Sequence, residues 1–279
     1  MTNPRLCYQT IEFGNTDIHL CTLRDRQEFH DPEGIAEGLG IGSALWPLFG
    51  VVWPSSLVLA NFISDYDTAS KRILEVGCGM ALSSLLLNKQ HADITATDYH
   101  PEANAFLQRN ALLNNDNAIA FERSDWIENN DSLGLFDLII GSDLLYEDRH
   151  IDLLSKFIES HSNRSCEVIV VDPGRGRKNK FITRMKAFGF TSVQHKPAHA
   201  DYLGHDFKGY ILKFERCSKT CLGVQNRESS SQGIPSLSPS ILVFGQLRKK
   251  NSASALDLIW LQCCLPSQLK PPGSRTCPL

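Results

Sequence analysis

The stretch Ile73-Leu74-Glu75-Val76-Gly77-Cys78-Gly79-Met80-Ala81 decides the fold class of this chain. Its apolar start predicts a buried strand, its two glycines predict a tight turn, and the apolar residues that follow predict a helix. Glycine at such a turn lets a ligand approach the bare backbone, where a Cβ would collide. A tight strand–helix connection that binds no ligand is the alternative explanation of the two glycines.

A second predicted strand, 93–97, leads to Asp98. In a strand–helix–strand unit, a carboxylate at this point is placed to hold the ribose hydroxyls of a nucleoside ligand. The dinucleotide fingerprint Gly-x-Gly-x-x-Gly/Ala fails here, because Leu82 stands at the sixth position, where a small residue is needed. The pattern therefore indicates a nucleoside ligand and argues against a dinucleotide.

Strands and helices alternate from Arg72 onward, which predicts an α/β fold with a Rossmann-like, seven-stranded sheet, five of its strands parallel, and helices on both faces. The expected strands are 72–76, 93–97, 118–122, 135–141 and 166–171, and the expected helices are 80–90, 101–114, 147–161 and 178–188. Two last strands, near 190–195 and 207–215, have no helix between them and are expected to pair antiparallel at one edge. Ligands of such sheets bind beyond the carboxyl ends of the strands. Those ends carry acidic residues: Glu75, Asp98, Asp125, Asp143 and Asp172.

The flanking segments divide the chain into three predicted parts. Residues 1–45 are expected to form an N-terminal hairpin over 8–23, with a turn at Gly14-Asn15, and a polar loop. Residues 46–216 form the sheet domain, whose first helix, running to about Ile63, would be capped by Ser55 or Ser56. Residues 217–279 are expected to be a poorly ordered, disordered tail. Its apolar piece near 255–264 leaves a membrane- or partner-binding helix open.

The composition narrows the class of protein. A hydrophobic content of 42% and a charged content of 21% are ordinary for a soluble globular protein. A net charge of −3 gives no electrostatic footprint for nucleic acid. No apolar run approaches the ~20 residues of a membrane span. His195, His199 and His205 do not share a helical face, because Pro197 interrupts them, so no metal site is predicted.

The start of the chain lacks the apolar core of a signal peptide. The nine cysteines are scattered, with no second pair at zinc spacing, and are expected to be reduced thiols. Together these features predict a cytoplasmic protein, which we also expect to be a monomer.

Residues from about 40 to 215 resemble the seven-β-strand S-adenosylmethionine-dependent methyltransferases, and among them the methyltransferase-like protein lysine methyltransferases. Three motifs carry the resemblance: Glu75-Val76-Gly77-Cys78-Gly79 with Asp98, the tryptophan-containing segment Val52-Trp53-Pro54-Ser55-Ser56-Leu57-Val58-Leu59-Ala60, and Asp143-Leu144-Leu145-Tyr146, which matches the pattern Asp/Glu-x-x-Tyr/Phe. Asp172-Pro173-Gly174-Arg175 is also similar to the electron-transfer-flavoprotein-directed enzymes. The chain departs from the family at Ala81, where a third glycine is common.

The resemblance implies that S-adenosylmethionine is the cofactor. It implies cofactor contacts for Trp53, Glu75, Gly77, Gly79, Asp98, Asp125 and Trp126. Asp143 would orient the incoming amine, and Tyr146 would wall or hydrogen-bond it. Structural alternatives stand beside these roles: Trp126 as a tryptophan at the edge of the core, Trp53 as a hydrophobic staple, Asp143 as the start of the next helix and Tyr146 as ordinary packing.

The leading hypothesis is therefore an N-methyltransferase that methylates lysine side chains of a protein substrate by direct in-line transfer. A small-molecule N-methyltransferase and an inactive S-adenosylmethionine-binding module are the alternatives. The basic run Arg175-Gly176-Arg177-Lys178 is either solvated charge or a contact for an acidic protein substrate.

Overall fold

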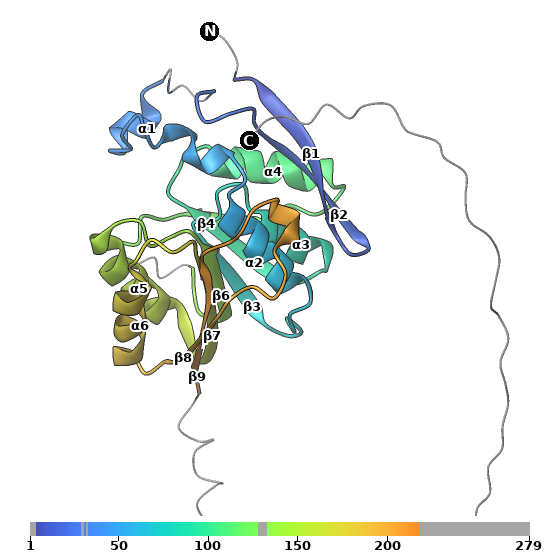
Figure 1. The fold of residues 1–279 in the computed structure, drawn as a ribbon. Coiled ribbons are helices and arrows are strands. Elements are labelled where there is room, and N and C mark those ends of the chain that lie inside the picture. Colours follow the sequence, from blue (N-terminus) through green and yellow to red (C-terminus); the bar gives the residue numbers. More distant parts are fainter. Residues whose placement is uncertain (1–3, 29–30, 32, 128–132, 218–279) are drawn as a thin grey trace, which may run out of the picture. The chain divides into compact units, whose positions relative to one another are not determined.

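Seven strands form the central sheet, in the spatial order β5-β4-β3-β6-β7-β9-β8. The computed structural model describes residues 4–28, 31, 33–127 and 133–217 (Figure 1). The strands from β3 to β7 pair in parallel, and β9 pairs antiparallel with both β7 and β8. The predicted seven-stranded sheet with an antiparallel edge is confirmed. The strand bounds are β3 (Arg72–Val76), β4 (Asp93–Asp98), β5 (Ala120–Arg123), β6 (Phe136–Ser142), β7 (Ser162–Asp172), β8 (Thr191–His195) and β9 (Tyr210–Arg216).

The order of the strands reverses at β3. Val76 of β3 pairs with Thr97 of β4 on one side and with Gly141 of β6 on the other. After β3 the chain builds outward through β4 and β5, and it then returns to add β6 and β7 on the opposite side. The carboxyl ends of β3 and β6 therefore flank a topological switch point, which is where open α/β sheets bind their ligands.

Helices cover both faces of the sheet, as Figure 1 shows. The helices α2 (Pro54–Ser64), α3 (Leu82–Lys89) and α4 (Ala103–Leu113) share one hydrophobic cluster with the sheet, and α5 (Asp148–His161) and α6 (Lys178–Ala187) share a second one. Consecutive residues of β3 go to opposite clusters: Ile73 to the first and Leu74 to the second. Because side chains alternate along a strand, a strand covered on both faces is apolar at nearly every position. This explains the continuous apolar runs of the sequence.

The hairpin β1 (Leu6–Phe13) and β2 (Thr16–Leu23) is held on α4 by two asparagines one helical turn apart. The Asn110 side chain accepts from the backbone N–H of Cys21 at 2.7 Å and donates to the carbonyl of Cys21 at 3.2 Å. Asn114 does the same for His19, at 2.8 and 2.7 Å. Each side-chain amide thus makes the two hydrogen bonds that a residue of a neighbouring strand would make with β2. Ile18 and Leu20 of β2 are fully buried in the first cluster.

The segment between the hairpin and α2 was predicted as a loop, but it contains the short helix α1 (Ile35–Gly38). The carboxylate of Asp31 accepts from the backbone N–H groups of Ile35 and Glu37 at 2.9 and 2.8 Å. These bonds satisfy amides that the first turn of a helix leaves unpaired, which allows so short a helix to form. A 3-10 helix, η1 (Trp46–Gly50), follows.

The predicted cap of α2 is wrong. Trp53 is the N-cap residue and Pro54 is the first helical residue, so Ser55 and Ser56 lie inside the first turn. Proline is favoured at this position because its missing N–H would have no partner there. The Ser56 hydroxyl donates to the carbonyl of Trp53 at 2.8 Å instead of capping an amide.

By length and composition, Trp46–Ser64 is the one stretch of the described residues that is long and apolar enough to cross a membrane. Its mean hydropathy is 1.4. Val58, Leu59, Ala60 and Ile63 are all buried in the first hydrophobic cluster, which gives the apolar side of α2 a place in the protein core. The stretch therefore has the character of a core helix.

The predicted tail, 217–279, lies outside the described residues apart from Cys217, and so does the apolar piece near 255–264. The predicted division of the chain at residues 45 and 216 stays a prediction.

Candidate active site

The turn between β3 and α3 is the centre of the candidate site. Gly77 and Gly79 have φ values of +62° and +52°, in the left-handed region that favours glycine. A Cβ at Gly77 would lie 2.5 Å from Cδ2 of Leu144, and one at Gly79 would lie 3.2 Å from the carbonyl oxygen of Phe49. Both the backbone conformation and the close neighbours therefore favour glycine at these two positions. Ala81, at φ +56°, adopts the same conformation as the N-cap of α3.

Asp98 is fixed against this turn at the carboxyl end of β4. Its Oδ2 accepts from the backbone N–H of Gly79 at 2.8 Å, and its Oδ1 accepts from the N–H of His100 at 2.8 Å. Burial raises the pKa of Asp98, and the backbone N–H groups of His100, Gly79 and Tyr99 act in the opposite direction. A carboxylate can accept about four hydrogen bonds, so the backbone leaves part of its acceptor capacity for a ligand. That capacity fits the two hydroxyls of a ribose, which is the group expected here.

Glu75 is nearly fully buried, with 3% of its surface exposed. Its Oε2 accepts from the backbone N–H of Ser84 at 3.0 Å and from the hydroxyl of the same residue. Burial is the main cause that raises its pKa to about 7, the bonds from Ser84 oppose the shift, and the charge of Asp98 adds to it. The carboxylate therefore joins β3 to the first turn of α3. Its predicted contact with the cofactor stays a prediction.

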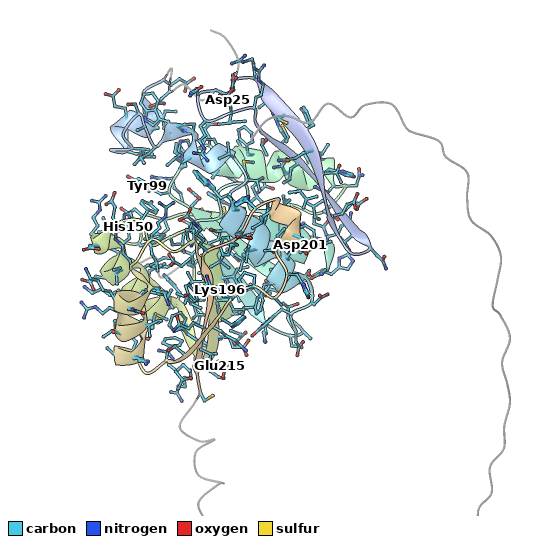
Figure 2. The ribbon with its side chains drawn as sticks, viewed as in Figure 1. Asp25, Tyr99, His150, Lys196, Asp201 and Glu215 are labelled. Atoms are coloured by element: carbon cyan, nitrogen blue, oxygen red, sulfur yellow. The ribbon has the colours of Figure 1, made fainter. Side chains whose placement is uncertain are left out.

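Trp126 lies against the same turn, although it comes from the loop after β5. Its Cζ2 is 3.9 Å from the position of a Cβ on Gly77, and its ring packs on the second hydrophobic cluster. It meets the ring of His150 edge-on, with 5.6 Å between the ring centroids. His150 is labelled in Figure 2. The indole thus both packs at the edge of the core and flanks the turn. Asp125 accepts from the backbone N–H of Ile127 at 2.9 Å.

Asp143 lies directly after β6, where its backbone N–H donates to the carbonyl of Val171 at 2.9 Å. Its φ is +56°. The alternative that Asp143 begins the next helix does not hold, because α5 starts at Asp148. Leu144, the next residue, is the side chain that meets Gly77. The Asp143-Leu144-Leu145-Tyr146 motif and the glycine turn are therefore in contact.

Both carboxylate oxygens of Asp143 are engaged by Arg175, from the loop after β7. Nε of Arg175 lies 2.5 Å from Oδ1, and Nη2 lies 2.8 Å from Oδ2. The pair holds the pKa of Arg175 above its usual range. The sequence analysis did not predict this pair. The carboxyl ends of two adjacent parallel strands, β6 and β7, bring the residues that follow them together, but the sequence does not indicate which of these side chains pair.

Tyr146 is 42% exposed. Its ring meets the His150 ring edge-on, with 4.5 Å between the centroids. Burial is the main cause that raises the pKa of the Tyr146 hydroxyl, and the charge of Asp98 adds to it. The side chain is thus partly open to solvent at the same end of the sheet as Asp98. The sequence analysis missed His150, which backs both Tyr146 and Trp126 from α5.

Trp53 is half-buried where η1 meets α2. Its indole N–H donates to the carbonyl of Leu48 at 2.9 Å, and the guanidinium of Arg26 lies over its ring at 4.3 Å from the centroid. Trp53 occupies the N-cap position, one residue after the position of a hydrophobic staple. A cofactor contact of this residue would have to use the ring face opposite Arg26, and it stays a prediction.

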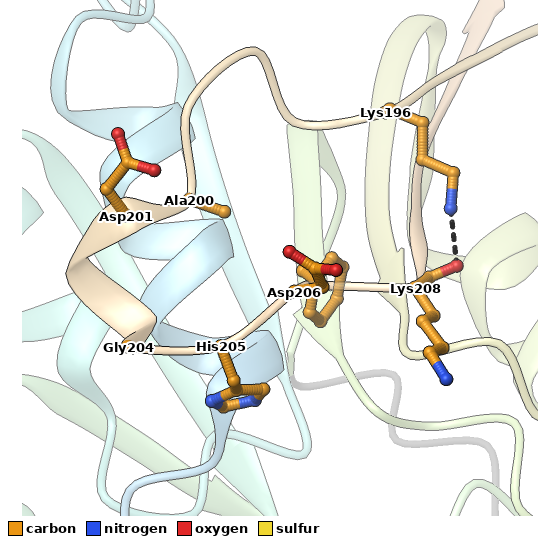
Figure 3. A pocket seen from close by; sticks show the side chains of 8 residues that line it. Lys196, Ala200, Asp201, Gly204, His205, Asp206 and Lys208 are labelled. Atoms are coloured by element: carbon orange, nitrogen blue, oxygen red, sulfur yellow. Dashed lines mark hydrogen bonds between the residues drawn. The ribbon is translucent and has the colours of Figure 1, made fainter.

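A hollow of about 630 Å³ in the β8–β9 connection contains no predicted site residue (Figure 3). Its charged lining residues carry both signs, because Lys196 and Lys208 stand with Asp201 and Asp206. The Lys196 ammonium donates to the carbonyl of Lys208 at 2.5 Å, the bond drawn in Figure 3. Within the described ranges, no group of three or more His, Cys, Asp or Glu residues could hold a metal ion.

Comparisons with known proteins point to one enzyme class. A family model described as lysine methyltransferase matches residues 44–188. The protein N-lysine methyltransferase METTL21A of Danio rerio is 29% identical over 153 residues, which cover 50% of this chain and 70% of that protein. The electron transfer flavoprotein beta subunit lysine methyltransferase of Mus musculus is 26% identical over 139 residues, which cover 47% of this chain and 54% of that protein.

Among solved structures, a SAM-dependent methyltransferase from Streptococcus mutans has the same fold. Its TM-score is 0.51 at 12% identity, and the match covers 75% of this chain and 55% of that one.

Proposed function

The chain belongs to the lysine methyltransferase family, and we propose that it transfers the methyl group of S-adenosylmethionine to the side-chain amine of lysine in a protein substrate. One observation carries the proposal. The Asp143-Leu144-Leu145-Tyr146 motif touches the glycine turn, because Leu144 packs directly on Gly77. The residues proposed for the acceptor and those proposed for the methyl donor therefore belong to one site, at the switch point of the sheet.

The proposed donor side of this site consists of the turn and Asp98. Gly77 and Gly79 keep the backbone free of Cβ atoms, and Asp98 retains acceptor capacity for two hydroxyls. When bound, S-adenosylmethionine supplies a methyl group on a positively charged sulfur, which a neutral amine attacks in line. The residues present fit such a group, since the glycine turn leaves the backbone bare and Asp98 can accept from ligand hydroxyls.

The acceptor side has to bind lysine and help it lose a proton. At a solution pKa of about 10.4, less than about 0.1% of a lysine is neutral at pH 7. A desolvated position beside an aromatic wall lowers that pKa. In the proposed mechanism, Asp143 orients the incoming amine and Tyr146 forms the wall. Positioning of the lone pair toward the methyl group then supplies much of the rate.

Labelled S-adenosylmethionine tests this proposal. The purified chain is incubated with cell extract and the labelled donor, and the products are separated into protein and small molecules. We expect the label in protein and, after hydrolysis, in methyllysine. Label in small molecules alone would favour the small-molecule alternative, and label in methylarginine or methylhistidine would contradict the lysine assignment.

Asp143→Ala provides the internal comparison. We expect this variant to bind S-adenosylhomocysteine as the unchanged chain does and to lose turnover. Asp137→Ala, near the opposite end of the same strand β6, is the matched control and should retain turnover, because the Asp137 carboxylate accepts from the backbone N–H of Arg72 and the side chain of Asn163. Full activity of Asp143→Ala would remove Asp143 from the mechanism.

We also propose that the chain acts in the cytoplasm as a monomer. Cys21, Cys78 and Cys166 are free thiols, as a reducing compartment would keep them. Cell fractionation checks the location, and light scattering of the purified chain checks the oligomeric state.

A further inference from the structure

The carboxylate that is proposed to receive the acceptor amine is already occupied by a cation of the same chain. Arg175 binds both oxygens of Asp143 in a fork, at 2.5 and 2.8 Å. In such a bidentate pair, both carboxylate oxygens already accept hydrogen bonds from the guanidinium in favourable geometry. A substrate ammonium therefore has to replace Arg175, or it has to bind elsewhere.

The two partners differ in how deeply they lie. The Asp143 side chain is 14% exposed, whereas the Arg175 side chain is 41% exposed. Asp143 is tied by its backbone N–H to β7, and its position follows from the sheet. Arg175 follows Gly174, whose φ of +100° is accessible to glycine. The guanidinium can thus move out into solvent while the carboxylate stays in place.

A second carboxylate lies at the same place. Asp172 is 1% exposed, and its Oδ2 accepts from the backbone N–H of Gly174 at 3.1 Å. Its Oδ1 is buried and has no hydrogen-bond partner among the described residues. Burial is the main cause that raises the pKa of Asp172; the charge of Asp143 adds to the shift, and the charge of Arg175 opposes it. When Arg175 moves away, the negative charges of Asp143 and Asp172 lose this nearby cation. Buried charge without an opposite charge is unfavourable, so the two carboxylates favour the binding of another cation.

We propose that the guanidinium of Arg175 occupies the acceptor subsite until the ammonium group of the substrate lysine displaces it. The inference rests on the proposed function and adds a selection rule: the acceptor has to arrive as a cation, because a neutral group cannot compensate the negative charge of Asp143 and Asp172 once the guanidinium leaves. Before methyl transfer the ammonium gives one proton to the Asp143 carboxylate, which leaves a neutral amine for the attack and keeps the total charge of the subsite unchanged. Arg175 is then a gating residue and takes no part in methyl transfer itself.

The test compares Arg175→Gln with Arg177→Gln. Arg177 lies two residues further on, pairs with Asp148 at the start of α5, and leaves Asp143 untouched, so it is the matched control. The probe is n-butylammonium, which has the end of a lysine side chain, titrated by calorimetry in the presence of S-adenosylhomocysteine. If the open form is about a fifth of the resting molecules or less, Arg175→Gln should bind the probe about fivefold more tightly or better. Arg177→Gln should bind it as the unchanged chain does.

A spectroscopic readout keeps the test independent of the variants. In the unchanged chain, saturating n-butylammonium should move the Nε–H resonance of Arg175 toward that of a solvated arginine and leave Arg177 unaffected. If Asp143→Asn abolishes probe binding while Arg175→Gln leaves the affinity unchanged, Asp143 stays the acceptor carboxylate and the gating role of Arg175 is overturned. If neither variant changes the affinity, the acceptor assignment itself fails.

Discussion

Asp98 shows how one side chain can serve the fold and leave capacity for a ligand. Its bond from the N–H of Gly79 joins β4 to the glycine turn, its bond from the N–H of His100 fixes the residues that follow β4, and acceptor capacity remains for ligand donors. Asp98→Asn keeps the shape but places an amide N–H₂ against one of these donors. Since hydrogen bonds to a charged group contribute about 1.5–3 kcal/mol, we expect S-adenosylhomocysteine to bind about 10- to 150-fold more weakly.

Isothermal titration measures this change. Asp93→Asn, at the exposed opposite end of β4, is the control and should leave the affinity unchanged. Equal affinities of the two variants would contradict the ribose assignment.

Alanine substitutions at Gly77 and Gly176 distinguish the effect of backbone strain from that of steric crowding. Gly77→Ala places a Cβ 2.5 Å from Leu144 in a left-handed conformation, whereas Gly176→Ala places one at φ +81° with nothing within 4 Å. Both variants carry the left-handed strain of about 1–2 kcal/mol. Only Gly77→Ala adds overpacking, of about 1–3 kcal/mol, and should unfold at lower denaturant concentration than Gly176→Ala. Coincident unfolding curves would show that the contact with Leu144 does not constrain the turn.

Glu75 makes a prediction about pH, because burial raises its pKa from 4.5 to about 7. A carboxyl group with a higher pKa in the folded chain binds its proton more tightly when folded. Its contribution to stability is therefore present at low pH and is lost as the pH rises from about 4.5 to about 7. Glu75→Gln removes this dependence, so its stability relative to the unchanged chain should rise by about 3 kcal/mol over that window.

Urea unfolding at pH 5 and pH 7.5, without cofactor, checks this result. Glu37→Gln, at an exposed position of α1, is the control. A difference between Glu75→Gln and the unchanged chain that stays constant with pH would contradict the assignment.

At the scale of elements, α4 acts as a substitute strand for the hairpin. Asn110 and Asn114 supply the donors and acceptors that the outer edge of β2 lacks. Asn110→Ala leaves the N–H and the carbonyl of buried Cys21 without these partners, at a cost of about 1–3 kcal/mol for each group. We expect a loss of about 2–4 kcal/mol in the free energy of unfolding and faster amide hydrogen exchange at Cys21.

The control for this prediction lies on the same helix. Asn104→Ala removes only an exposed contact with Gln108 and should change stability by less than about 0.5 kcal/mol. If Asn110→Ala were as mild as Asn104→Ala, the hairpin would be held by its apolar contacts alone.

The sequence predicts best those elements that are stabilised by burial against apolar neighbours and not by one specific side chain. The strand predicted at 72–76 matches β3 residue for residue, because a strand that is buried on both faces has a nearly continuous apolar sequence. The strand predicted at 166–171 begins four residues earlier, at Ser162, and ends at Asp172. Asn163 in this polar start is held by Asp137 at 2.7 Å, a partner from another strand that no local pattern reveals.

For the whole molecule, the alternation of strands and helices predicted a parallel sheet whose carboxyl ends carry the acidic residues, and the structure adds the order of the strands. The sequence alone could also predict that the turn and the Asp143 motif would be neighbours. It could not predict that Arg175 would occupy Asp143, or that Glu75 would be bound by Ser84. Those pairings depend on side-chain directions in the folded chain, for which one sequence carries no signal.

A crystal structure of the chain with S-adenosylhomocysteine tests the central claim most directly. The claim predicts density at the turn between β3 and α3, with the ribose hydroxyls on Asp98 and the sulfur facing Asp143 and Tyr146. Density at another place, or none at a saturating concentration, would contradict it.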